Sequence, residues 1–423
     1  MKYHFLFFLF AAGLAFSQQK IITESPESVG ISTERLKILN GRMHKFVDEG
    51  KISSVQTAIM RRGKLIHFNT YGYKDIESQS KLNYNSIFRI YSMTKPIVSI
   101  ALMILFEEGK FQLFDPIEKY IPELREMKAY KNGKFVKTQN KIKIIDLLRH
   151  TSGIGSGRGN KTKLIDSLYI NQTNEILSNK DLFNNKDLIN KIKNLPLNFE
   201  PSTEWKYGLS TNVIGHLVEI LSGLSLDKYL EDKIFKPLGM DDTSFKLPKE
   251  KISRFVTQYS FTNQNNLKVT DHPSNSQFTK NITFFSGGGG LLSSMEDYLI
   301  FCQMLLNKGM YKNRRIVGSK TIELMTSDHL NYILDKTQYN KNGFYLPKSG
   351  TSFGLGFAVT TNVAESNLLG SVGSYGWGGA AGTFFRIDPK EDLIYILMIQ
   401  NLNHSRLMIR QFFQNLVYQS IID

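Results

Sequence analysis

The chain has 423 residues, enough for a large hydrophobic core and for two subdomains within one fold. Its apolar fraction of 41% and charged fraction of 22% are those of an ordinary soluble globular protein. The formal net charge is +15, but the lysines are spread along the chain and no nucleic-acid-binding module is visible, so we expect no nucleic-acid partner. Attraction to an anionic envelope surface stays open.

The first residues have the pattern of a secretory signal peptide. A positively charged start precedes the apolar run Phe5–Phe16, and Ala15 and Ser17 occupy positions −3 and −1 of a cut after Ser17. The run is shorter than the ~20 residues that a membrane span needs. We therefore expect residues 1–17 to be removed and the mature protein to be periplasmic or secreted, without a membrane span. The alternative is a buried N-terminal helix.

Three elements are predicted in the next part of the chain. A helix begins at Ser32 and runs to about Gly50. A β-hairpin follows, with strands at Val55–Met60 and Leu65–Thr70. The segment Ile97–Phe106 is apolar on nearly all sides, which predicts a helix buried deep in the fold.

The middle of the chain, residues 111–284, is predicted to contain helices and loops. Two amphipathic helices, Val213–Ser222 and Leu226–Phe235, are joined at Gly223. Residues 156–195 are rich in Asn, Lys and Asp and show weak periodicity. We expect that stretch to be a surface excursion or a lid.

Strands return after residue 285. Strands at both ends of the chain, with helices inserted between them, predict a split α/β layer plus a helical subdomain. The α/β subdomain would consist of residues 18–110 and 285–423, and the helical subdomain of residues 111–284. Predicted late elements are the strands Gly354–Thr361, Gly382–Ile387 and Leu393–Gln400, and the helices Glu296–Leu306, which holds the single cysteine Cys302, and Arg406–Tyr418.

The spacing Ser-x-x-Lys, a weak signal alone, occurs at 78–81, 92–95 and 225–228. The first lies in a polar stretch, and the third begins an amphipathic helix that its serine is expected to cap. The second precedes the buried helix. Residues i and i+3 share a face there, so Lys95 would stand beside the Ser92 hydroxyl and, with little water near, could take its proton. The alternative is that Ser92 only caps the helix.

Two further segments contain residue types that suit a site. Tyr207 lies shortly before a predicted helix, and a phenol beside a lysine can act as a general base and later as a general acid. The glycine-rich segment 375–383 runs into a predicted strand, and its backbone N–H groups can form an oxyanion hole. Alone, each segment also fits a plainer interpretation, a half-buried aromatic residue and a glycine-rich turn.

The order of several short segments is similar to that of a known family. They are PESVG at 26–30, FRIYSMTKP at 88–96, LLRHTSG at 147–153, WKY at 205–207, PLGM at 237–240 and SGGGGL at 286–291. Over about residues 24–420 the chain resembles the serine β-lactamase-like, or penicillin-binding, superfamily, especially its class C branch and the family VIII carboxylesterases. This resemblance implies a β-lactamase/transpeptidase-like fold. That fold is an α+β sandwich with an antiparallel sheet flanked by helices, an inserted all-helical subdomain, and the site between the two subdomains.

The resemblance also implies a set of roles. Ser92 would be the acylated nucleophile, and Lys95 and Tyr207 would transfer protons. The backbone N–H groups of Ser92 and Ala380 would form the oxyanion hole. The reaction would be a two-step acyl transfer without metal or cofactor, and His150 would be a hydrogen-bonded structural residue.

The chain departs from the family pattern at two positions. β-Lactamases and peptidases of the superfamily usually have Lys or His where Trp377 stands, and often Asn where Leu209 stands. A tryptophan has one N–H donor and no charge, so a substrate carboxylate would be left unpaired there. Trp377, Gly378 and Gly379 are similar to the motif of family VIII esterases. We expect these three residues and Leu209 to contact substrate.

The sequence thus predicts a serine hydrolase with a Ser-Lys-Tyr acyl-enzyme mechanism, most simply a carboxylesterase acting on short-chain acyl esters. The alternatives are a β-lactamase or D-alanyl-D-alanine peptidase-like enzyme on envelope substrates, an amide hydrolase or acyltransferase, and a non-catalytic penicillin- or peptidoglycan-binding module. The expected partner is a small-molecule ester or amide. The loops at 156–195 and 330–352 are expected to form walls of the substrate site.

Overall fold

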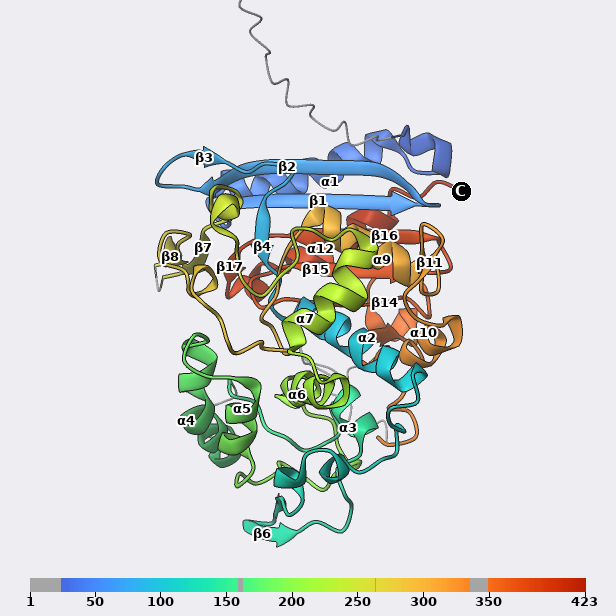
Figure 1. Ribbon diagram of the computed structural model, residues 1–423. Coiled ribbons are helices and arrows are strands. Elements are labelled where there is room, and N and C mark those ends of the chain that lie inside the picture. The colour runs from blue at the N-terminus through green and yellow to red at the C-terminus, as the bar shows by residue number, and fades with distance from the viewer. Residues whose placement is uncertain (1–23, 159–162, 263, 335–348) are drawn as a thin grey trace, which may run out of the picture.

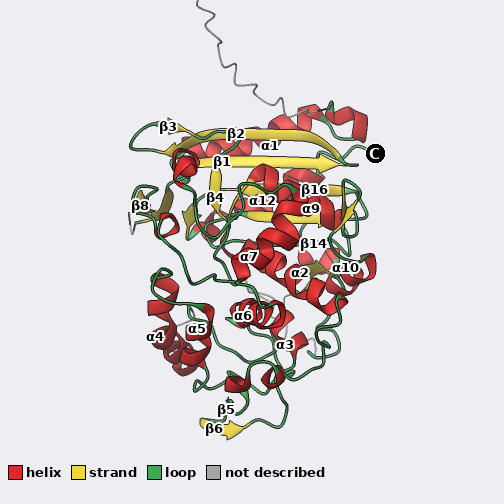
Figure 2. Cartoon of the chain, in the orientation of Figure 1, coloured by secondary structure: helices red, strands yellow, loops and turns green. Residues whose placement is uncertain are grey.

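An eight-stranded antiparallel sheet forms the core of one half of the molecule (Figures 1 and 2). The computed structural model describes residues 24–158, 163–262, 264–334 and 349–423, and the predicted signal peptide lies outside them. The strand order is β12-β13-β14-β15-β16-β1-β2-β3, so the paired strands β1 and β16 come from opposite ends of the chain. The strands are β1 (Ser54–Arg61), β2 (Lys64–Asp75), β3 (Ser80–Lys81), β12 (Thr351–Phe353), β13 (Ala358–Thr360), β14 (Tyr375–Gly378), β15 (Phe384–Asp388) and β16 (Leu393–Met398).

Both faces of the strand β16 are buried, which explains why its sequence is apolar at every position. Successive side chains point to opposite faces. Tyr395 packs with α1 and α12, whereas Ile396 belongs to the larger core to which α2 and α9 contribute. The predicted antiparallel sheet flanked by helices is confirmed. These helices are α1 (Thr33–Asp48), α2 (Thr94–Glu107), α9 (Met295–Leu306) and α12 (Ile409–Tyr418).

The other half of the molecule consists mainly of helices, of which α3, α4, α5 and α6 lie below α2 in the view of Figure 1. Helix α6 packs against α2, and α3, α5 and α7 pack against α6. The buried helix α2 therefore connects the two halves, as its apolar sequence predicts. The helices are α3 (Ile144–Leu148), α4 (Leu164–Ser178), α5 (Asn185–Ile192), α6 (Ser210–Ser222), α7 (Leu226–Leu230) and α8 (Lys236–Leu238), and a hairpin is formed by β5 (Lys128–Lys131) and β6 (Lys134–Lys137).

The segment 156–195 is more regular than its sequence indicates, because it contains α4 and α5. Helix α4 buries a stripe at helical spacing that includes Tyr169, Thr173 and Ile176, and the mixed polarity of this stripe hides it from a hydrophobic pattern. Helix α5 begins with a capping box in which Asn184 and Asp187 satisfy each other's backbone N–H groups. The capping box was a readable signal.

The predicted strand at 354–361 is wrong in its extent, because the chain turns within it. Strand β12 ends at Phe353 and β13 begins at Ala358, and the two pair as a hairpin. Gly356 takes a left-handed φ of 93° in the turn, and a side chain at Gly354 would overlap the carbonyl of Met325. The two glycines that lie between the strands, Gly354 and Gly356, therefore mark a turn.

Smaller elements complete the fold. Strand β4 pairs with β9, and β17, β7 and β8 form a three-stranded sheet.

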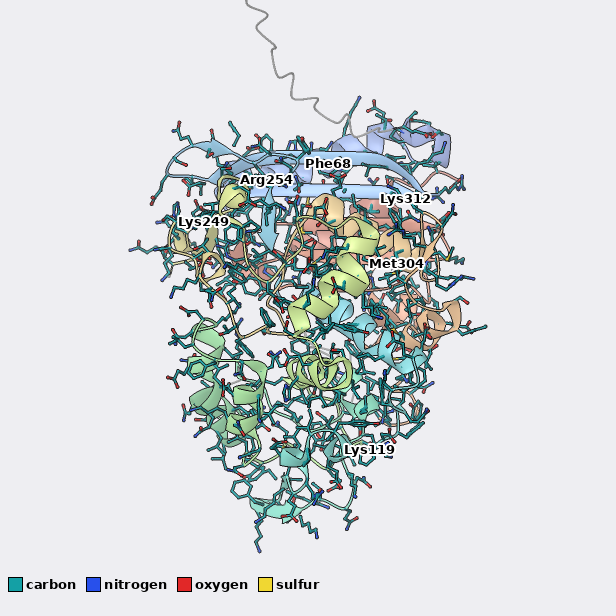
Figure 3. All side chains as sticks on the ribbon, in the orientation of Figure 1. Phe68, Lys119, Lys249, Arg254, Met304 and Lys312 are labelled. Atoms are coloured by element: carbon teal, nitrogen blue, oxygen red, sulfur yellow. The ribbon has the colours of Figure 1, made fainter. Side chains whose placement is uncertain are left out.

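The labelled lysines Lys119, Lys249 and Lys312 lie far apart in Figure 3, in agreement with charge spread over the molecule. Within the described ranges, no helix combines the length and the hydropathy needed to cross a membrane. The subdomain boundaries near residues 110 and 285 stay predictions. The remaining elements are β4 (Ile87–Arg89), β7 (Gln258–Phe261), β8 (Leu267–Asp271), β9 (Leu292–Ser294), β10 (Met310–Tyr311), β11 (Arg314–Arg315), α10 (Ser319–Met325), α11 (Val363–Ser366) and β17 (Asn401–Leu402).

Candidate active site

The segment before the predicted nucleophile is held rigidly in the core. Strand β4 pairs with β9, and the N–H of Ile90 donates to the carbonyl of Leu291 across 3.1 Å. Arg89 is fully buried and donates to the carboxylate of Asp271 at 2.6 Å and to the carbonyl of Val256 at 2.6 Å. These contacts fix the backbone that enters the next turn.

Ser92 lies in a 3₁₀ turn, Tyr91–Met93, directly before α2. Tyr91 has a φ of 43°, a left-handed conformation that a bulky residue adopts only where its surroundings impose it. Its hydroxyl donates to the side chain of Gln258. The N-cap of α2 is Met93. The plainer interpretation of Ser92 as the helix cap is therefore excluded.

Lys95 lies one turn further along and contacts the Ser92 hydroxyl. The two atoms, Lys95 Nζ and Ser92 Oγ, are 3.4 Å apart, as the spacing i, i+3 predicts. Lys95 is 4% exposed, and its ammonium also donates to the carbonyl of Gly288 at 2.5 Å. It lies 4.5 Å from the ring centre of Tyr207. No carboxylate of the described residues forms an ion pair with Lys95, so its proton is shared with neutral oxygens only.

The glycine-rich segment 286–290 brings the carbonyl of Gly288 to Lys95. A side chain at Gly288 would overlap the amide of Asn212 in α6, and a Cβ at Gly287 would lie 2.5 Å from the carbonyl of Thr211. The Asn212 amide donates to the Ser286 hydroxyl at 2.9 Å. Glycine is required at 287 because the segment packs there directly against the backbone of α6. The sequence pattern marks this segment as similar to the family but does not indicate a role for Gly288.

Tyr207 is presented by a tight loop that precedes α6. A Cβ at Gly208 would lie 2.5 Å from the carbonyl of Ile154, and the N–H of Leu209 donates to the carbonyl of Gly155 at 3.0 Å. Tyr207 itself is half-buried, with one face toward Lys95. Leu209, expected to contact substrate, is 6% exposed and packs in the main hydrophobic core.

Tyr207 belongs to an aromatic cluster of five rings. The indole N–H of Trp377 donates to the Tyr207 hydroxyl at 3.4 Å, and the two ring centres are 5.5 Å apart. His150 lies 4.9 Å from the ring of Tyr207. Burial, and then the charge of Lys95, lower the pKa of His150 well below its usual value, so its imidazole is neutral at neutral pH. The cluster is completed by Trp205 and Phe353.

His150 is buried, but its hydrogen bonding is not as predicted. Its Nδ1 atom is buried without a hydrogen-bond partner in the part of the chain that the structure describes. Ring packing against Tyr207, Trp205 and Phe353 holds the imidazole instead.

The loop after β14 lies against the nucleophile segment and is anchored from behind by an arginine. A side chain at Gly379 would overlap the carbonyl of Ile90. Arg410, in the first turn of α12, donates to the carbonyl of Gly379 and to that of Thr383 at 2.7 Å. The carbonyl and N–H of one peptide point in opposite directions, so this contact turns the N–H of Ala380 away from α12. Sequence reasoning missed Arg410.

The loop has a free N–H group at Ala380 and a charged arginine, Arg410, behind it. The N–H of Ala380 donates to no atom of the described residues, and Ala380 is exposed, so its N–H is free for a ligand. Burial lowers the pKa of Arg410 to about 10, which leaves its guanidinium charged at neutral pH. The arginine is therefore a permanent donor to the carbonyl of Gly379.

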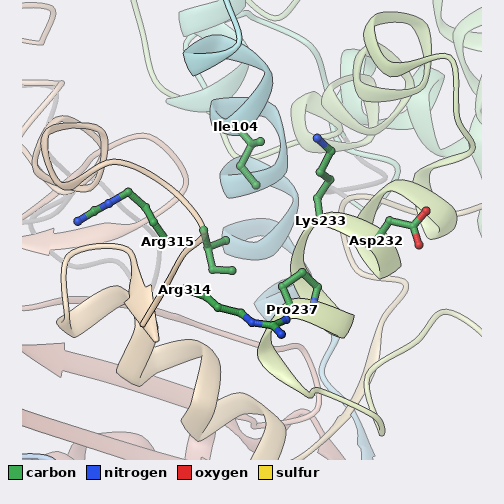
Figure 4. Close-up of a pocket in the computed structure, with 7 residues that line it drawn as sticks. Ile104, Asp232, Lys233, Pro237, Arg314 and Arg315 are labelled. Carbon is green, nitrogen blue, oxygen red and sulfur yellow. The ribbon is translucent and has the colours of Figure 1, made fainter. Parts of the chain in front are cut away.

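A separate cavity lies at the other end of α2 and is shown in Figure 4. It has a volume of about 430 Å³, and Ile104, in the last turn of α2, lines it together with Asp232 and Arg314. Ser92 precedes the first turn of α2, so the cavity is not part of the site described above. No group of metal-binding side chains occurs among the described residues.

The chain matches known proteins over nearly all of its length. The family model described as Beta-lactamase matches residues 39–412. Protein Rv1367c of Mycobacterium tuberculosis is 31% identical over 372 residues, covering 85% of this chain and 88% of that protein. A second relative, from Salmonella typhimurium, is named as a candidate D-alanyl-D-alanine carboxypeptidase. It is 25% identical over 411 residues, and the match covers 91% of this chain and 87% of that protein.

Solved structures share the fold. EstCE1, a hydrolase with promiscuous acyltransferase activity, has a TM-score of 0.77 at 22% identity, covering 91% of this chain and 98% of that one. Simvastatin synthase LovD from Aspergillus terreus has a TM-score of 0.76 at 21% identity, covering 92% and 98%. Both agree with the predicted β-lactamase/transpeptidase-like fold. The chain belongs to the β-lactamase family of serine hydrolases.

Proposed function

We propose that this protein is a carboxylesterase that hydrolyses short-chain acyl esters through an acyl-enzyme on Ser92. The observation that carries the proposal is the position of Lys95. Its buried ammonium contacts the Ser92 hydroxyl and the Gly288 carbonyl and has no carboxylate partner among the described residues. A lysine held in this way can exchange a proton with the serine, because no acid fixes its charge.

The reaction follows from these contacts in two steps. Ser92 Oγ attacks the ester carbonyl carbon and its proton passes to the Lys95–Tyr207 pair, while the N–H groups of Ser92 and Ala380 stabilise the oxyanion. The C–O bond to the alcohol breaks, and Tyr207 returns the proton to the leaving oxygen. Water then attacks the acyl-enzyme by the same route in reverse, which releases the acid and restores Ser92.

Trp377 favours an ester over a β-lactam or a peptide with a free carboxylate. Its only polar atom donates to Tyr207, and it supplies no cation for a substrate carboxylate. Arg410, the cation nearest this loop by its contacts, is directed to the carbonyls of Gly379 and Thr383. A carboxylate in this part of the site would be desolvated without a partner.

A D-alanyl-D-alanine peptidase is the second candidate, and the Salmonella relative of that name favours it. The acyl-enzyme step would be the same, but the substrate would carry a terminal carboxylate next to Trp377. Hydrolysis of an acyl-D-alanyl-D-alanine peptide, compared with a p-nitrophenyl ester, distinguishes the two.

The test of the nucleophile is labelling by a fluorophosphonate, followed by intact-protein mass spectrometry and p-nitrophenyl butyrate turnover. We expect one label on the wild type, and neither label nor turnover with Ser92→Ala. Ser225→Ala is the matched control, because Ser225 belongs to another Ser-x-x-Lys sequence but begins α7 and is exposed. A Ser92→Ala protein that still hydrolyses the ester contradicts the proposal. A folded wild type without label or turnover favours the binding-module alternative.

We propose also that the protein is exported by its first 17 residues. The support is the signal-peptide pattern of the sequence. Expression in a bacterial host with an intact secretion system, followed by mass spectrometry of the extracellular and periplasmic fractions, should find a chain that begins at Gln18. A chain that keeps residues 1–17 and stays with the cytoplasmic fraction contradicts this proposal.

A further inference from the structure

Lys180, directly after α4, is a buried lysine without an acid partner. It is 7% exposed, and its ammonium lies 4.1 Å from the ring centre of Phe278. Its backbone carbonyl accepts the N–H groups of Thr283 and Phe284, both at 2.9 Å, so its position is fixed. The ammonium makes no hydrogen bond or ion pair with the described residues. A buried charge without a partner is costly, and an anionic group bound beside it would offset that cost.

The surroundings of Lys180 contain more positive than negative charge. The charged groups that act on it are Arg158, Arg89 and Asp271. Asp271 is already used, because its carboxylate pairs with Arg89 at 2.6 Å and accepts the Ser276 hydroxyl at 2.9 Å. Burial, and then the charge of Arg158, lower the pKa of Lys180 to about 7. The charged groups around Lys180 therefore include no anion that is free to pair with its ammonium.

Arg89 links Lys180 to the segment of the proposed nucleophile. Lys180 Nζ lies 4.1 Å and the Arg89 guanidinium 5.8 Å from the ring centre of Phe278, and Arg89 ends β4 three residues before Ser92. The segment that fixes the Lys180 carbonyl, 283–284, also continues directly into the glycine-rich segment whose Gly288 carbonyl binds Lys95. Helix α4 and strand β8 lie to one side of the start of α2 in Figure 1, and β14, with Trp377, lies to the other.

We propose that Lys180 binds a carboxylate on the acyl part of the substrate. The inference rests on the proposed function and gives its substrate class: esters whose acyl chain ends in a carboxylate, such as monoesters of a dicarboxylic acid. Tyr207 hands its proton to the leaving alcohol and contacts Trp377, so the alcohol leaves on the Trp377 side. The acyl chain then extends past Tyr91 toward Lys180.

The test compares two esters of the same chain length, p-nitrophenyl hemiglutarate and p-nitrophenyl pentanoate, which differ by a terminal carboxylate. For the wild type at pH 7, we expect kcat/KM to be at least about tenfold higher for hemiglutarate. Lys180→Met should abolish this preference and leave pentanoate hydrolysis and the melting temperature unchanged or higher, since it removes a buried charge. Lys249→Met, a change of the same charge at an exposed position, should keep the preference.

Lys180→Arg separates binding of a charge from a structural role. A guanidinium stays charged at every pH of the assay, whereas Lys180 in the empty site loses its proton near pH 7. The ratio of the two kcat/KM values should therefore fall between pH 7 and 9 for the wild type and stay level for Lys180→Arg. Taking the ratio cancels the titration of the groups that act on both esters.

The outcomes distinguish this inference from the proposed function. A wild type that hydrolyses pentanoate through Ser92 but shows no preference for hemiglutarate overturns the inference and leaves the esterase standing. A preference that survives in Lys180→Met overturns it as well. Absence of Ser92-dependent turnover of both esters overturns both proposals.

Discussion

The indole N–H of Trp377 donates to the hydroxyl oxygen of Tyr207 at 3.4 Å, while the ammonium of Lys95 lies 4.5 Å from the ring centre of the same tyrosine. The phenol therefore has a neutral donor on its oxygen and a cation at its ring. Both interactions stabilise negative charge on the phenol, which is the form in which Tyr207 would accept a proton. The residue that distinguishes this chain from β-lactamases thus acts on the predicted base.

Trp377→Phe removes this donor and keeps an aromatic ring in the cluster. We expect kcat for p-nitrophenyl butyrate to fall by about fivefold, the effect of one hydrogen bond worth about 1 kcal/mol in the transition state. Steady-state kinetics of the wild type and the variant with this ester measure the change. An unchanged rate would mean that the N–H has no part in catalysis.

Tyr207→Phe and Lys95→Met should each lower kcat by about 10²- to 10⁴-fold, since both remove a proton-transfer group. Their effects should not add, because the two residues act as one unit. Single-turnover kinetics of both single variants and the double variant measure this. A double variant whose loss equals the product of the single losses would argue for two independent roles.

Benzylpenicillin should be turned over by the wild type far more slowly than ~1 s⁻¹, an ordinary enzyme rate. The reason is the absence of a cation at Trp377 for the carboxylate of the drug. Trp377→Lys restores a cation and should raise the rate of acylation of Ser92 by benzylpenicillin, read by intact mass. Fast turnover by the wild type would favour the β-lactamase alternative.

Arg410 is expected to be a positioning residue for the oxyanion loop, because it holds the carbonyl of Gly379. Arg410→Ala should lower kcat by about 10²-fold with little change in KM, as loss of an oxyanion donor does. Arg410→Lys should recover part of the rate. The matched control is Arg406→Ala, since Arg406 is exposed and binds Asn265. A parallel rise in KM, or loss of near-ultraviolet circular dichroism, would indicate general disruption instead.

Asp297, in the first turn of α9, should make stability fall with rising pH. Its carboxyl accepts the N–H of Asp242 at 2.8 Å and the Thr243 hydroxyl at 2.7 Å, and burial raises its pKa to about 7. Between about pH 4, where the unfolded carboxyl ionises, and pH 7, the folded state holds a proton that the unfolded state lacks. The free energy of unfolding therefore declines across that window and levels off above it.

Asp297→Asn removes this titration while keeping an oxygen acceptor. Urea denaturation at pH 5, 6, 7 and 8 should show the wild type losing stability relative to the variant up to about pH 7. Two parallel curves would show that Asp297 does not titrate in this range.

Local spacing predicted the part of the site that lies within one turn of helix. Ser92 and Lys95 meet because i and i+3 share a face, and the apolar sequence that follows them is a buried helix. Order along the chain, compared with a known family, added Tyr207. The hairpin of β1 and β2 and the central strand β16 were also readable from their apolar patterns.

The remaining contacts depend on residues that are far apart in sequence and have no local pattern. The carbonyl of Gly288 reaches Lys95, and Arg410 reaches Gly379, only after the two halves of the fold have packed. A backbone carbonyl has no signature in a sequence, and an arginine in an amphipathic helix resembles any solvated one. The sequence does not reveal the unpaired charge of Lys180 either, because a buried lysine has the same letter as a solvated one.

The pairing of β1 with β16 has a consequence for how the protein folds as it is made. Ala58 faces Ile396, so the sheet cannot be completed until almost the whole chain has left the ribosome. Contacts between residues so far apart in the sequence form slowly, because a large loop must close first. A chain truncated before residue 390 would contain Ser92, Lys95 and Tyr207 and yet lack the strand against which the sheet is built. Catalytic competence in this protein should therefore arise late, as one cooperative event at the end of synthesis.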